Sequence, residues 1–359
     1  MSSGIQTTLQ EMSVAAPSWF TSDRSDGKDV VLTTRLRLAR NLHGQVFPHQ
    51  AQEEVQEALL RTVWDACDSV EPFTGSQKIS MADLTWEDRR FLMERFLVDS
   101  AMTGAEGSRG VALNRAEDLT VLVNEEDHVR LQSVASGLSP DEAWTALDRV
   151  DDTLGETLAW AYRDGTGYLT ASPTNVGTGL RMSLLIHLPA LVLTSDVEHV
   201  LRKVAAYGMR IRGVHGDGSA VFGNLFRLSN DPTLGRSEED IMRSVAGTAH
   251  QLEKYELDAR ETLWQEARAQ LEDKIHRALG ILQSARVLSQ RECMNLLSAV
   301  RLGVNMDVLS GVELHRLDTL TILTQPSHLD RRAGRVLEPG ERDVLRAEAV
   351  RDSLASGRN

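Results

Sequence analysis

The sequence VLVNEEDHVR, residues 121–130, decides how the rest of the chain is interpreted. Its first three residues are apolar, and two of them are β-branched, which is typical of a strand. Residues 124–128 follow at once and bring three adjacent carboxylates into one loop. Carboxylates this close repel one another unless a cation lies beside them. For an average charge run, a solvated turn would be the simpler interpretation.

Arginines elsewhere in the chain favour a binding site instead. Arg35 and Arg37 stand two residues apart, and Arg181 and Arg212 lie in other short segments far away in the sequence. Carboxylates and guanidinium groups together suggest a site for a cationic nucleophile and a polyanion.

The composition limits the possible partners. The net charge of −13 over 359 residues argues against binding nucleic acid or an anionic membrane, because both require a basic surface. The cysteines, Cys67 and Cys293, are far apart and lack metal-ligand spacing, so no disulfide framework or zinc site is expected. No stretch approaches the roughly 20 apolar residues of a membrane span. We therefore expect a cytoplasmic protein.

The apolar periodicity predicts a mixed α+β part. Residues 1–20 are expected to form a flexible tail. Alternation from residue 31 places Arg35 and Arg37 on one face of an extended segment. Capping boxes are expected where Thr85, Ser139 and Ser195 each precede an acidic residue by three positions. Further elements are expected as a helix over 50–67, a helix over 85–98, a hairpin over 111–123 and a strand over 129–134.

Two loops contain several glycines. Residues 173–179 precede an apolar stretch that begins near Arg181, and the sequence GVHGDG, residues 213–218, follows Arg212. The first loop lacks the Lys-Ser/Thr ending of a P-loop and the G-x-G-x-x-G spacing. Any phosphate binding there would depend on arginine and backbone amides.

From about residue 238 the composition changes to helix formers. One long amphipathic helix is expected over 264–282, and a second begins at Ser289, with Glu292 completing its cap. The predicted organisation is a tail over 1–20, a catalytic domain over 21–250 and an all-helical C-terminal domain over 251–359.

Five segments together resemble the ATP:guanido phosphotransferase family. They stand in the family's order and approximate spacing, and they are TTRLRLARN, NEEDHVR, SPTNVGTGLR, RGVHGDGSAVFGN and LSNDPTLGRSEEDI. The chain is most similar to the bacterial protein-arginine kinase branch (McsB type), because the helical module follows the arginine motifs instead of preceding them. The resemblance implies an antiparallel sheet flanked by helices, with the helical domain as a regulatory and dimerisation unit.

The resemblance also implies roles for individual residues. Glu126 matches the family's catalytic carboxylate, and Asp217 aligns with a second acid that is usually glutamate. Ser172 stands where the family usually has cysteine, and Phe96 where it usually has histidine. ATP is the implied cosubstrate, with Mg²⁺ held mainly through its phosphates and no dedicated protein ligands for the metal. The implied ATP-binding residues are Thr33, Thr34, Arg35, Leu36, Arg37, Arg130, Arg181, Met182, Ser183, Leu184, Leu185, Arg212, Gly213, Val214, His215 and Gly216.

Three functions are weighed on this basis. The first is a kinase that phosphorylates arginine side chains in proteins with Mg-ATP and so marks them for degradation or regulation. The second is a kinase for a small guanidino compound such as free arginine. The third is a weakened relative that only binds phosphoarginine. The set of five arginines with Glu126 favours an enzyme. The resemblance implies protein substrates, a homodimer, an activator protein and a Clp-type protease as partners.

The C-terminal sequence RDVLRA, residues 342–347, matches a motif that the protein-arginine kinase branch uses as an allosteric phosphoarginine pocket. In a helix, Arg342 and Arg346 would share one face, with Asp343 beside them. Two guanidinium groups suit phosphoryl oxygens, and a carboxylate suits the N–H groups of the ligand. A bare six-residue pattern of this kind would ordinarily be an exposed salt bridge. Collinearity with the upstream motifs favours a binding site.

Overall fold

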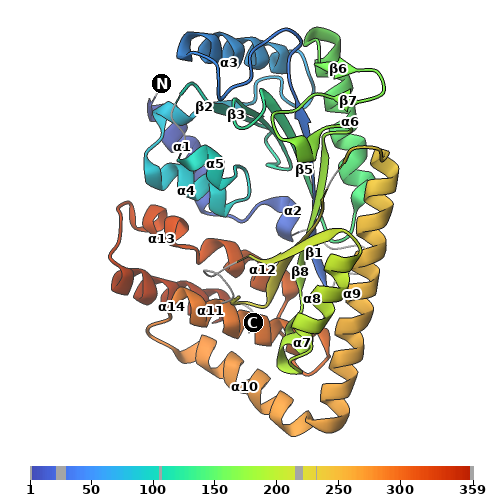
Figure 1. Cartoon of the computed structure of the whole chain (residues 1–359). Coiled ribbons are helices and arrows are strands. Elements are labelled where there is room, and N and C mark those ends of the chain that lie inside the picture. Colours follow the sequence, from blue (N-terminus) through green and yellow to red (C-terminus); the bar gives the residue numbers. More distant parts are fainter. Residues whose placement is uncertain (1, 22–29, 105–106, 215–220, 232, 356–359) are drawn as a thin grey trace.

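One antiparallel sheet organises the first two thirds of the chain. The computed structural model describes residues 2–21, 30–104, 107–214, 221–231 and 233–355. Within them the sheet has eight strands in the order β2-β3-β4-β5-β1-β8-β10-β9 (Figure 1). The bounds are β1 Val31–Arg40, β2 Gln77–Ser80, β3 Gly110–Leu113, β4 Leu119–Val123, β5 Val129–Ser136, β8 Leu180–His187, β9 Met209–Gly213 and β10 Leu225–Asn230. A separate hairpin joins β6 Tyr162–Arg163 to β7 Gly167–Tyr168.

The central strand β1 separates an apolar face from a charged one. Leu36 and Leu38 are fully buried against helices, whereas Arg35 and Arg37 point to the opposite face because side chains alternate along a strand. β5 and β8 flank β1 in a register that sets Arg37 opposite Arg181 and Ala39 opposite Arg130. The predicted alternation is therefore confirmed.

Helices cover the apolar face of the sheet and form the largest core with it. The long helix α9 runs along one edge of the molecule, and α10 turns back below α11 and α14 (Figure 1). The covering helices are α3 Glu53–Asp68, α6 Pro140–Thr157, α7 Pro189–Leu193, α8 Val197–Ala206 and α9 Glu238–Glu266.

The charged face is covered partly by N-terminal and partly by C-terminal helices. Trp19 and Phe20 pack with Met294 and Ile322 over β1, β5, β8 and β10. A separate cluster packs α1, α4 and α5 against β2, β3 and β4. The N-terminal helices are α1 Ser2–Ser13, α2 Ser18–Thr21, α4 Trp86–Glu94 and α5 Ser100–Thr103.

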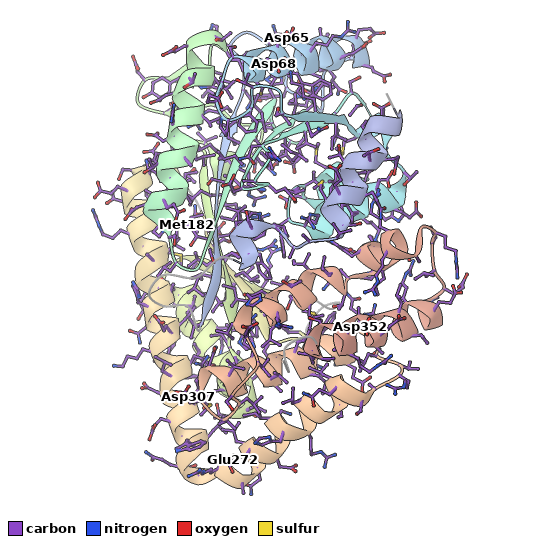
Figure 2. The ribbon with its side chains drawn as sticks, turned by 180° about the vertical axis from the view of Figure 1, so that it is seen from behind. Asp65, Asp68, Met182, Glu272, Asp307 and Asp352 are labelled. Atoms are coloured by element: carbon purple, nitrogen blue, oxygen red, sulfur yellow. The ribbon has the colours of Figure 1, made fainter. Side chains whose placement is uncertain are left out.

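The C-terminal helices have a core of their own, as predicted for an all-helical module. Over the described residues no helix is long and apolar enough to cross a membrane. Acidic side chains lie at both ends of the molecule, since Asp68 is on α3 and Glu272 on α10 (Figure 2). The bounds are α10 Arg268–Ser284, α11 Gln290–Asn305, α12 Leu314–Leu323, α13 Pro326–Ala333 and α14 Pro339–Ala355.

The N-terminal segment differs from the flexible tail predicted for residues 1–20. Its described part forms α1 and α2, and Leu9 and Phe20 are fully buried. The segment is polar overall, so its few apolar residues gave little periodic signal. Their burial against α4 and the sheet fixes it in place.

One helix prediction is wrong in detail. The single helix expected over 264–282 is divided at Ala267, whose backbone leaves the helical region (φ −139°, ψ 32°). α9 itself continues through the predicted domain boundary at residues 250–251. The division is tertiary in origin, because α10 turns there to pack on α11.

Two of the four predicted helix caps are confirmed and two are wrong. Thr85 forms a capping box with Asp88, and Ser289 Oγ accepts from Glu292 N. Ser139 does not cap α6, because its hydroxyl donates to Ser136 O at 2.8 Å. Ser195 adopts φ 65° in the turn before α8, so Asp196 takes the N-cap position.

Gly303 tests the packing of α10 on α11. A Cβ at this position would lie 2.3 Å from Ile275 Cγ2 and 3.0 Å from Leu309 Cδ1. Gly303→Ala should therefore lower the free energy of unfolding by about 1 to 2 kcal/mol, because the buried neighbours must shift. Gly280→Ala on α10 is the matched control. Nothing lies within 4 Å of its added methyl, so it should raise stability by up to about 1 kcal/mol. Urea denaturation measures both, and equal effects would contradict this packing.

Candidate functional site

Four strands gather five arginines on the charged face of the sheet. β1 supplies Arg35 and Arg37, β5 supplies Arg130, and β8 supplies Arg181. Arg227 on β10 joins them, and of the charged neighbours it has the largest effect on the pKa of Arg35. The sequence reasoning missed Arg227, although a lone arginine within the apolar stretch LFRLS was a usable signal. We refer to these five residues as the arginine cluster.

The arginine cluster is buried and electrostatically crowded. Burial, with repulsion from neighbouring arginines, lowers the pKa of Arg35 and of Arg37 to about 10. Arg35 Nη2 and Arg37 Nε are buried and have no hydrogen-bond partner among the described residues. Buried donors of this kind are costly unless an acceptor reaches them. The cluster is therefore suited to an anion with several oxygen atoms.

One carboxylate, Asp99, lies among these arginines. It forms an ion pair with Arg37, and its oxygens lie 3.5 Å from Arg35 Nη1 and 3.6 Å from Arg130 Nη1. Burial disfavours the charged carboxylate, but the guanidinium groups outweigh it and hold the pKa of Asp99 well below its usual range. Sequence reasoning missed Asp99 as well. It follows α4 by several residues, and only the tertiary fold brings it to β1.

The acidic loop lies beside Arg130. Glu125 is buried and pairs with Arg130, while Glu126 is about half exposed, with Oε2 3.4 Å from Arg130 Nη2. Burial raises the pKa of the Glu125 carboxyl, and Arg130 opposes that rise. The cation that was expected beside these carboxylates is therefore Arg130, which follows the acidic loop by two residues. Glu126 is the more accessible of the two glutamates.

Hydrogen bonds fix the shape of the acidic loop. Asp127 Oδ1 accepts from Asn41 Nδ2 and from Ala171 N, both at 2.7 Å. His128 Nδ1 accepts from Leu42 N at 3.1 Å, and His128 Nε2 lies 2.8 Å from Val46 O, which requires the neutral Nε2–H tautomer. Burial lowers the pKa of His128 and favours that neutral form. Asp127 thus connects the acidic loop to the segment that carries Ser172.

A cavity of about 280 Å³ opens between the arginine cluster and the acidic loop. Ser172 lies on its wall, where its hydroxyl contacts Thr174 Oγ1 at 2.9 Å. A second cavity of about 410 Å³ also has Asp99 in its wall, and apolar and polar residues from both parts of the chain line it in equal number. The first cavity is lined by Arg37, Ala39, Asp99, Glu125, Glu126, Arg130, Ser172, Thr174, Asn175, Gly179 and Arg181.

Only some of the other predicted ATP-binding residues lie near the arginine cluster. Ser183 Oγ lies 3.4 Å from Arg35 Nε, and Leu185 and Val214 line the second cavity. Thr33 is buried on β1, Thr34 Oγ1 donates to Gly137 O, and Arg212 and Gly213 are exposed at the end of β9. Three predicted residues point into the core on the opposite face, namely Leu36, Met182 and Leu184. His215, Gly216 and Asp217 lie outside the described residues.

Phe96 occupies a position between the two parts of the chain. It follows α4 with φ 61°, packs edge-on against Trp19 and lines the second cavity. Phe96 therefore lies outside the helix, which was expected to continue to residue 98 but ends at Glu94. No group of three His, Cys, Asp or Glu side chains is arranged to hold a metal ion within the described ranges.

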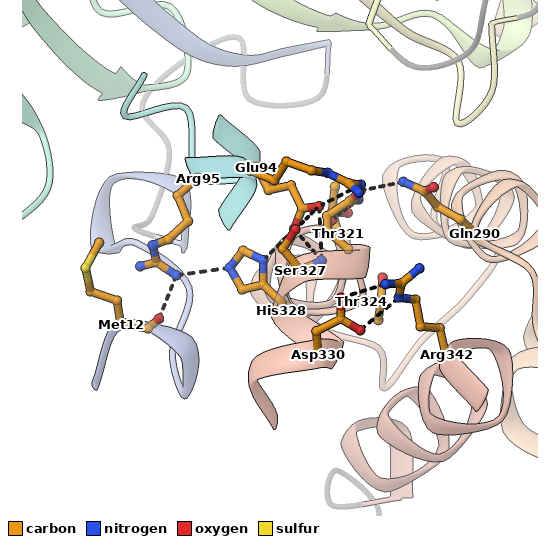
Figure 3. Close-up of polar contacts among 12 residues, drawn as sticks. Met12, Glu94, Arg95, Gln290, Thr321, Thr324, Ser327, His328, Asp330 and Arg342 are labelled. Carbon is orange, nitrogen blue, oxygen red and sulfur yellow. Dashed lines mark hydrogen bonds and ion pairs between the residues drawn. The ribbon is translucent and has the colours of Figure 1, made fainter. Parts of the chain in front are cut away.

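The three residues predicted to bind phosphoarginine lie on α14, as expected for a helix. Arg342 donates from Nε and Nη2 to both oxygens of Asp330, at 2.8 and 2.7 Å (Figure 3). Arg346 is buried and donates to Thr324 O, Leu288 O and Asp343 Oδ1, at 3.0, 2.8 and 2.5 Å. Arg346 therefore joins several C-terminal segments, and Arg342 is the more accessible of the two arginines.

Helix α13 connects this region to α4. Glu94 accepts from Ser327 N and Ser327 Oγ, each at 3.0 Å, and from His328 Nδ1 at 3.1 Å (Figure 3). His328 Nε2 lies 3.4 Å from Arg95 Nη1, and burial lowers the pKa of His328. The neutral Nδ1–H tautomer satisfies both contacts, since it donates to Glu94 and accepts from Arg95.

Comparison with known protein families gives two adjoining matches. Residues 58–259 match the model of the ATP:guanido phosphotransferase C-terminal catalytic domain. Residues 268–359 match the model of the protein-arginine kinase McsB C-terminal domain. The two matches meet near the break between α9 and α10.

Curated relatives resemble the chain over most of its length. A protein-arginine kinase of Caldanaerobacter subterraneus subsp. tengcongensis is 41% identical over 330 residues, which is 91% of this chain and 97% of the relative. A protein-arginine kinase of Pelotomaculum thermopropionicum is 37% identical over 353 residues, which is 97% of this chain and 99% of the relative.

Solved structures confirm the fold of the sheet domain. A crystal structure of lombricine kinase aligns with a TM-score of 0.57 and 21% identity, over 67% of this chain and 71% of the other. A duplicated taurocyamine kinase from Schistosoma mansoni with bound transition state analog components aligns with a TM-score of 0.59 and 21% identity. That alignment covers 80% of this chain and 43% of the other.

Asp127 provides a test of how the acidic loop is held. Asp127→Ala removes the acceptor that Asn41 and Ala171 share, and should lower the free energy of unfolding by about 3 to 6 kcal/mol, given about 1.5 to 3 for each of the two charge-assisted hydrogen bonds. Asp127→Asn keeps an oxygen in the same place and should lose less than half as much. Urea denaturation compares the two. A loss in the alanine variant no larger than that of Asp164→Ala, an exposed residue in the β6–β7 turn, would contradict this role.

Proposed function

Because the chain belongs to the ATP:guanido phosphotransferase family, we propose that it transfers the γ-phosphoryl group of ATP to arginine side chains of proteins. Protein substrates are favoured over free arginine or another small guanidino compound, because the C-terminal domain and the curated relatives belong to the protein-arginine kinase branch. The site needs an anion clamp, a proton acceptor and room for a guanidinium group.

The observation that carries the proposal is the arginine cluster, in which Arg35 Nη2 and Arg37 Nε are buried without a partner among the described residues, while Arg37 and Glu126 line the same cavity. Phosphoryl transfer requires little covalent help from the protein, and it is accelerated by fixed positive charge around the migrating group and by alignment of the reactants. Arg35, Arg37, Arg130 and Arg181 supply this charge from neighbouring strands, so their positions are set by the sheet. Mg²⁺ enters bound to the phosphate oxygens and offsets part of their charge.

Glu126 is assigned the role of the base. The substrate guanidinium must lose a proton as its nitrogen forms the N–P bond and the bond from the γ-phosphorus to ADP breaks. Glu126 lies on the wall of the 280 Å³ cavity with its carboxylate accessible, whereas Glu125 is buried against Arg130. Glu126 therefore takes the proton, and Glu125 holds Arg130. Ser172 on the same cavity wall, and Asp217, are proposed to orient the substrate guanidinium.

Incubation with Mg-ATP tests the proposed function directly. One sample contains an unfolded protein rich in arginine, and another contains free arginine at the same arginine concentration. Acid-labile phosphate on protein arginine, detected by mass spectrometry, is the expected result. Transfer to free arginine alone would favour the small-molecule kinase, and transfer to neither would leave only a binding function.

Glu126→Gln keeps the shape of the side chain and removes the proton acceptor. Turnover should fall by about 10²-fold or more, the usual range for a positioned general base, while nucleotide affinity stays within about threefold of wild type because the arginine cluster is intact. Glu54→Gln, an exposed change on α3, is the matched control. Near-normal arginine phosphorylation by Glu126→Gln would remove Glu126 from this role.

We also propose that phosphoarginine binds at α14 and activates the kinase. The ligand's phosphoryl group would pair with Arg342, taking the place of Asp330, and its N–H groups would donate to Asp343. Arg346 supports this pocket by holding Asp343, Thr324 O and Leu288 O in place. Activation requires that the ligand bind two states of the protein with different affinity.

Titration of free phosphoarginine against the kinase rate tests this second site. Wild type should be stimulated, and Arg342→Ala and Arg346→Ala should lose the stimulation while they retain ATP binding. Arg332→Ala on α13, whose side chain is about half exposed, should respond as wild type does. Identical titration curves for wild type and Arg342→Ala would exclude the pocket. Thermal unfolding of Arg346→Ala separates lost regulation from lost stability.

A further inference from the structure

The side chain of Asp99 does not cap the helix that it precedes. It is the N-cap residue of α5, but its side chain accepts no capping hydrogen bond. Its carboxylate turns instead toward Arg35, Arg37 and Arg130 on β1 and β5. An Asp at an N-cap ordinarily stabilises the first turn of a helix. Here the carboxylate instead forms ion pairs with the arginine cluster.

Asp99 also lies in the walls of both cavities. It lines the 280 Å³ cavity together with Arg37 and Glu126, and it lines the 410 Å³ cavity together with Arg35 and Phe96. A ligand that extends from the larger cavity to the acidic loop would lie against this carboxylate. Its side chain is 28% exposed, so it borders open space into which it can rotate.

A single carboxylate satisfies the cluster only in part. Its two oxygens are shared among three guanidinium groups, and Arg35 Nη2 and Arg37 Nε remain without a partner among the described residues. A chain of phosphate groups carries more charge and more acceptor oxygens, so it can occupy these donors and outcompete the carboxylate. A monovalent anion offers no such advantage.

We propose that Asp99 occupies the place of a nucleotide phosphate group among Arg35, Arg37 and Arg130, and that it is displaced when the polyphosphate binds. Asp99 thereby sets the affinity of the site and restricts it to polyanions. The inference rests on the proposed function for the identity of the polyphosphate. Only molecules in which Asp99 has left the cluster can bind the polyphosphate. The apparent affinity for polyphosphate is therefore reduced in proportion to the fraction of such molecules.

If Asp99 had a different role, as a ligand of Mg²⁺, its removal would change nucleotide affinity in the opposite direction. If Asp99 stayed in place and held the Mg²⁺ that accompanies the phosphates, its loss would weaken nucleotide binding, and only when the metal is present. Removal of a competing carboxylate strengthens binding with or without the metal. The direction of the change therefore distinguishes the two roles.

Calorimetric titration with inorganic tripolyphosphate, in the presence of EDTA, tests the proposal on the full-length chain. Asp99→Asn should bind tripolyphosphate about tenfold or more tighter than wild type, because the competing charge is gone. Asp68→Asn on α3, which forms an ion pair with Lys78 and lies outside the cluster, has the same change in net charge and should bind as wild type does. Asp99→Glu keeps the charge and should retain weak binding.

Unchanged or weaker binding by Asp99→Asn would overturn the proposal. Weakening confined to titrations of ATP with Mg²⁺ would assign Asp99 to the metal instead. Asp99→Ser provides the same test if the asparagine variant does not fold, since both lack the charge. The proposed function fails separately, if wild type transfers no phosphate to arginine, and tripolyphosphate affinity does not depend on that result.

Discussion

The structure depends on the balance between carboxylates and guanidinium groups on one face of β1. Five arginines on adjacent strands would repel one another strongly in a buried setting. Asp99 and Glu125 offset part of this repulsion, and each comes from a segment outside β1. The packing of these segments against the sheet is therefore an electrostatic requirement as well as a hydrophobic one. The opposite face of β1 is free of this constraint, so it can pack as an ordinary apolar core.

The local sequence predicted those features that depend on periodicity. Alternation in β1 placed Arg35 and Arg37 on one face, and the hydrophobic run before the acidic loop correctly indicated a strand. The fold class and the family could be recognised because five motifs keep their order. The C-terminal helices were likewise visible as an amphipathic pattern.

The features that the sequence did not predict arise from tertiary contacts. Asp99 lies 62 residues from Arg37 in the sequence, and nothing near it distinguishes it from a solvated aspartate. Ser139 stands in a capping-box sequence, but its hydroxyl donates a hydrogen bond to Ser136 O at the end of the preceding strand. α1 has too few apolar residues to show periodicity, yet Leu9 is fully buried. In each case the partner is chosen by the fold and not by neighbouring residues.

Helix α13 is only eight residues long, and it is held at both ends by charge. Glu94 receives two donors from Ser327 at its N-terminal end, where a carboxylate also complements the helix dipole, and Asp330 receives Arg342 nearer its C-terminal end. A helix of two turns behaves as a rigid rod, so the two ends cannot move independently. Any coupling of α4 to α14 through this helix would be reciprocal: a change at α4 that altered the contact with α14 would be matched by an equal free energy acting from α14 on α4.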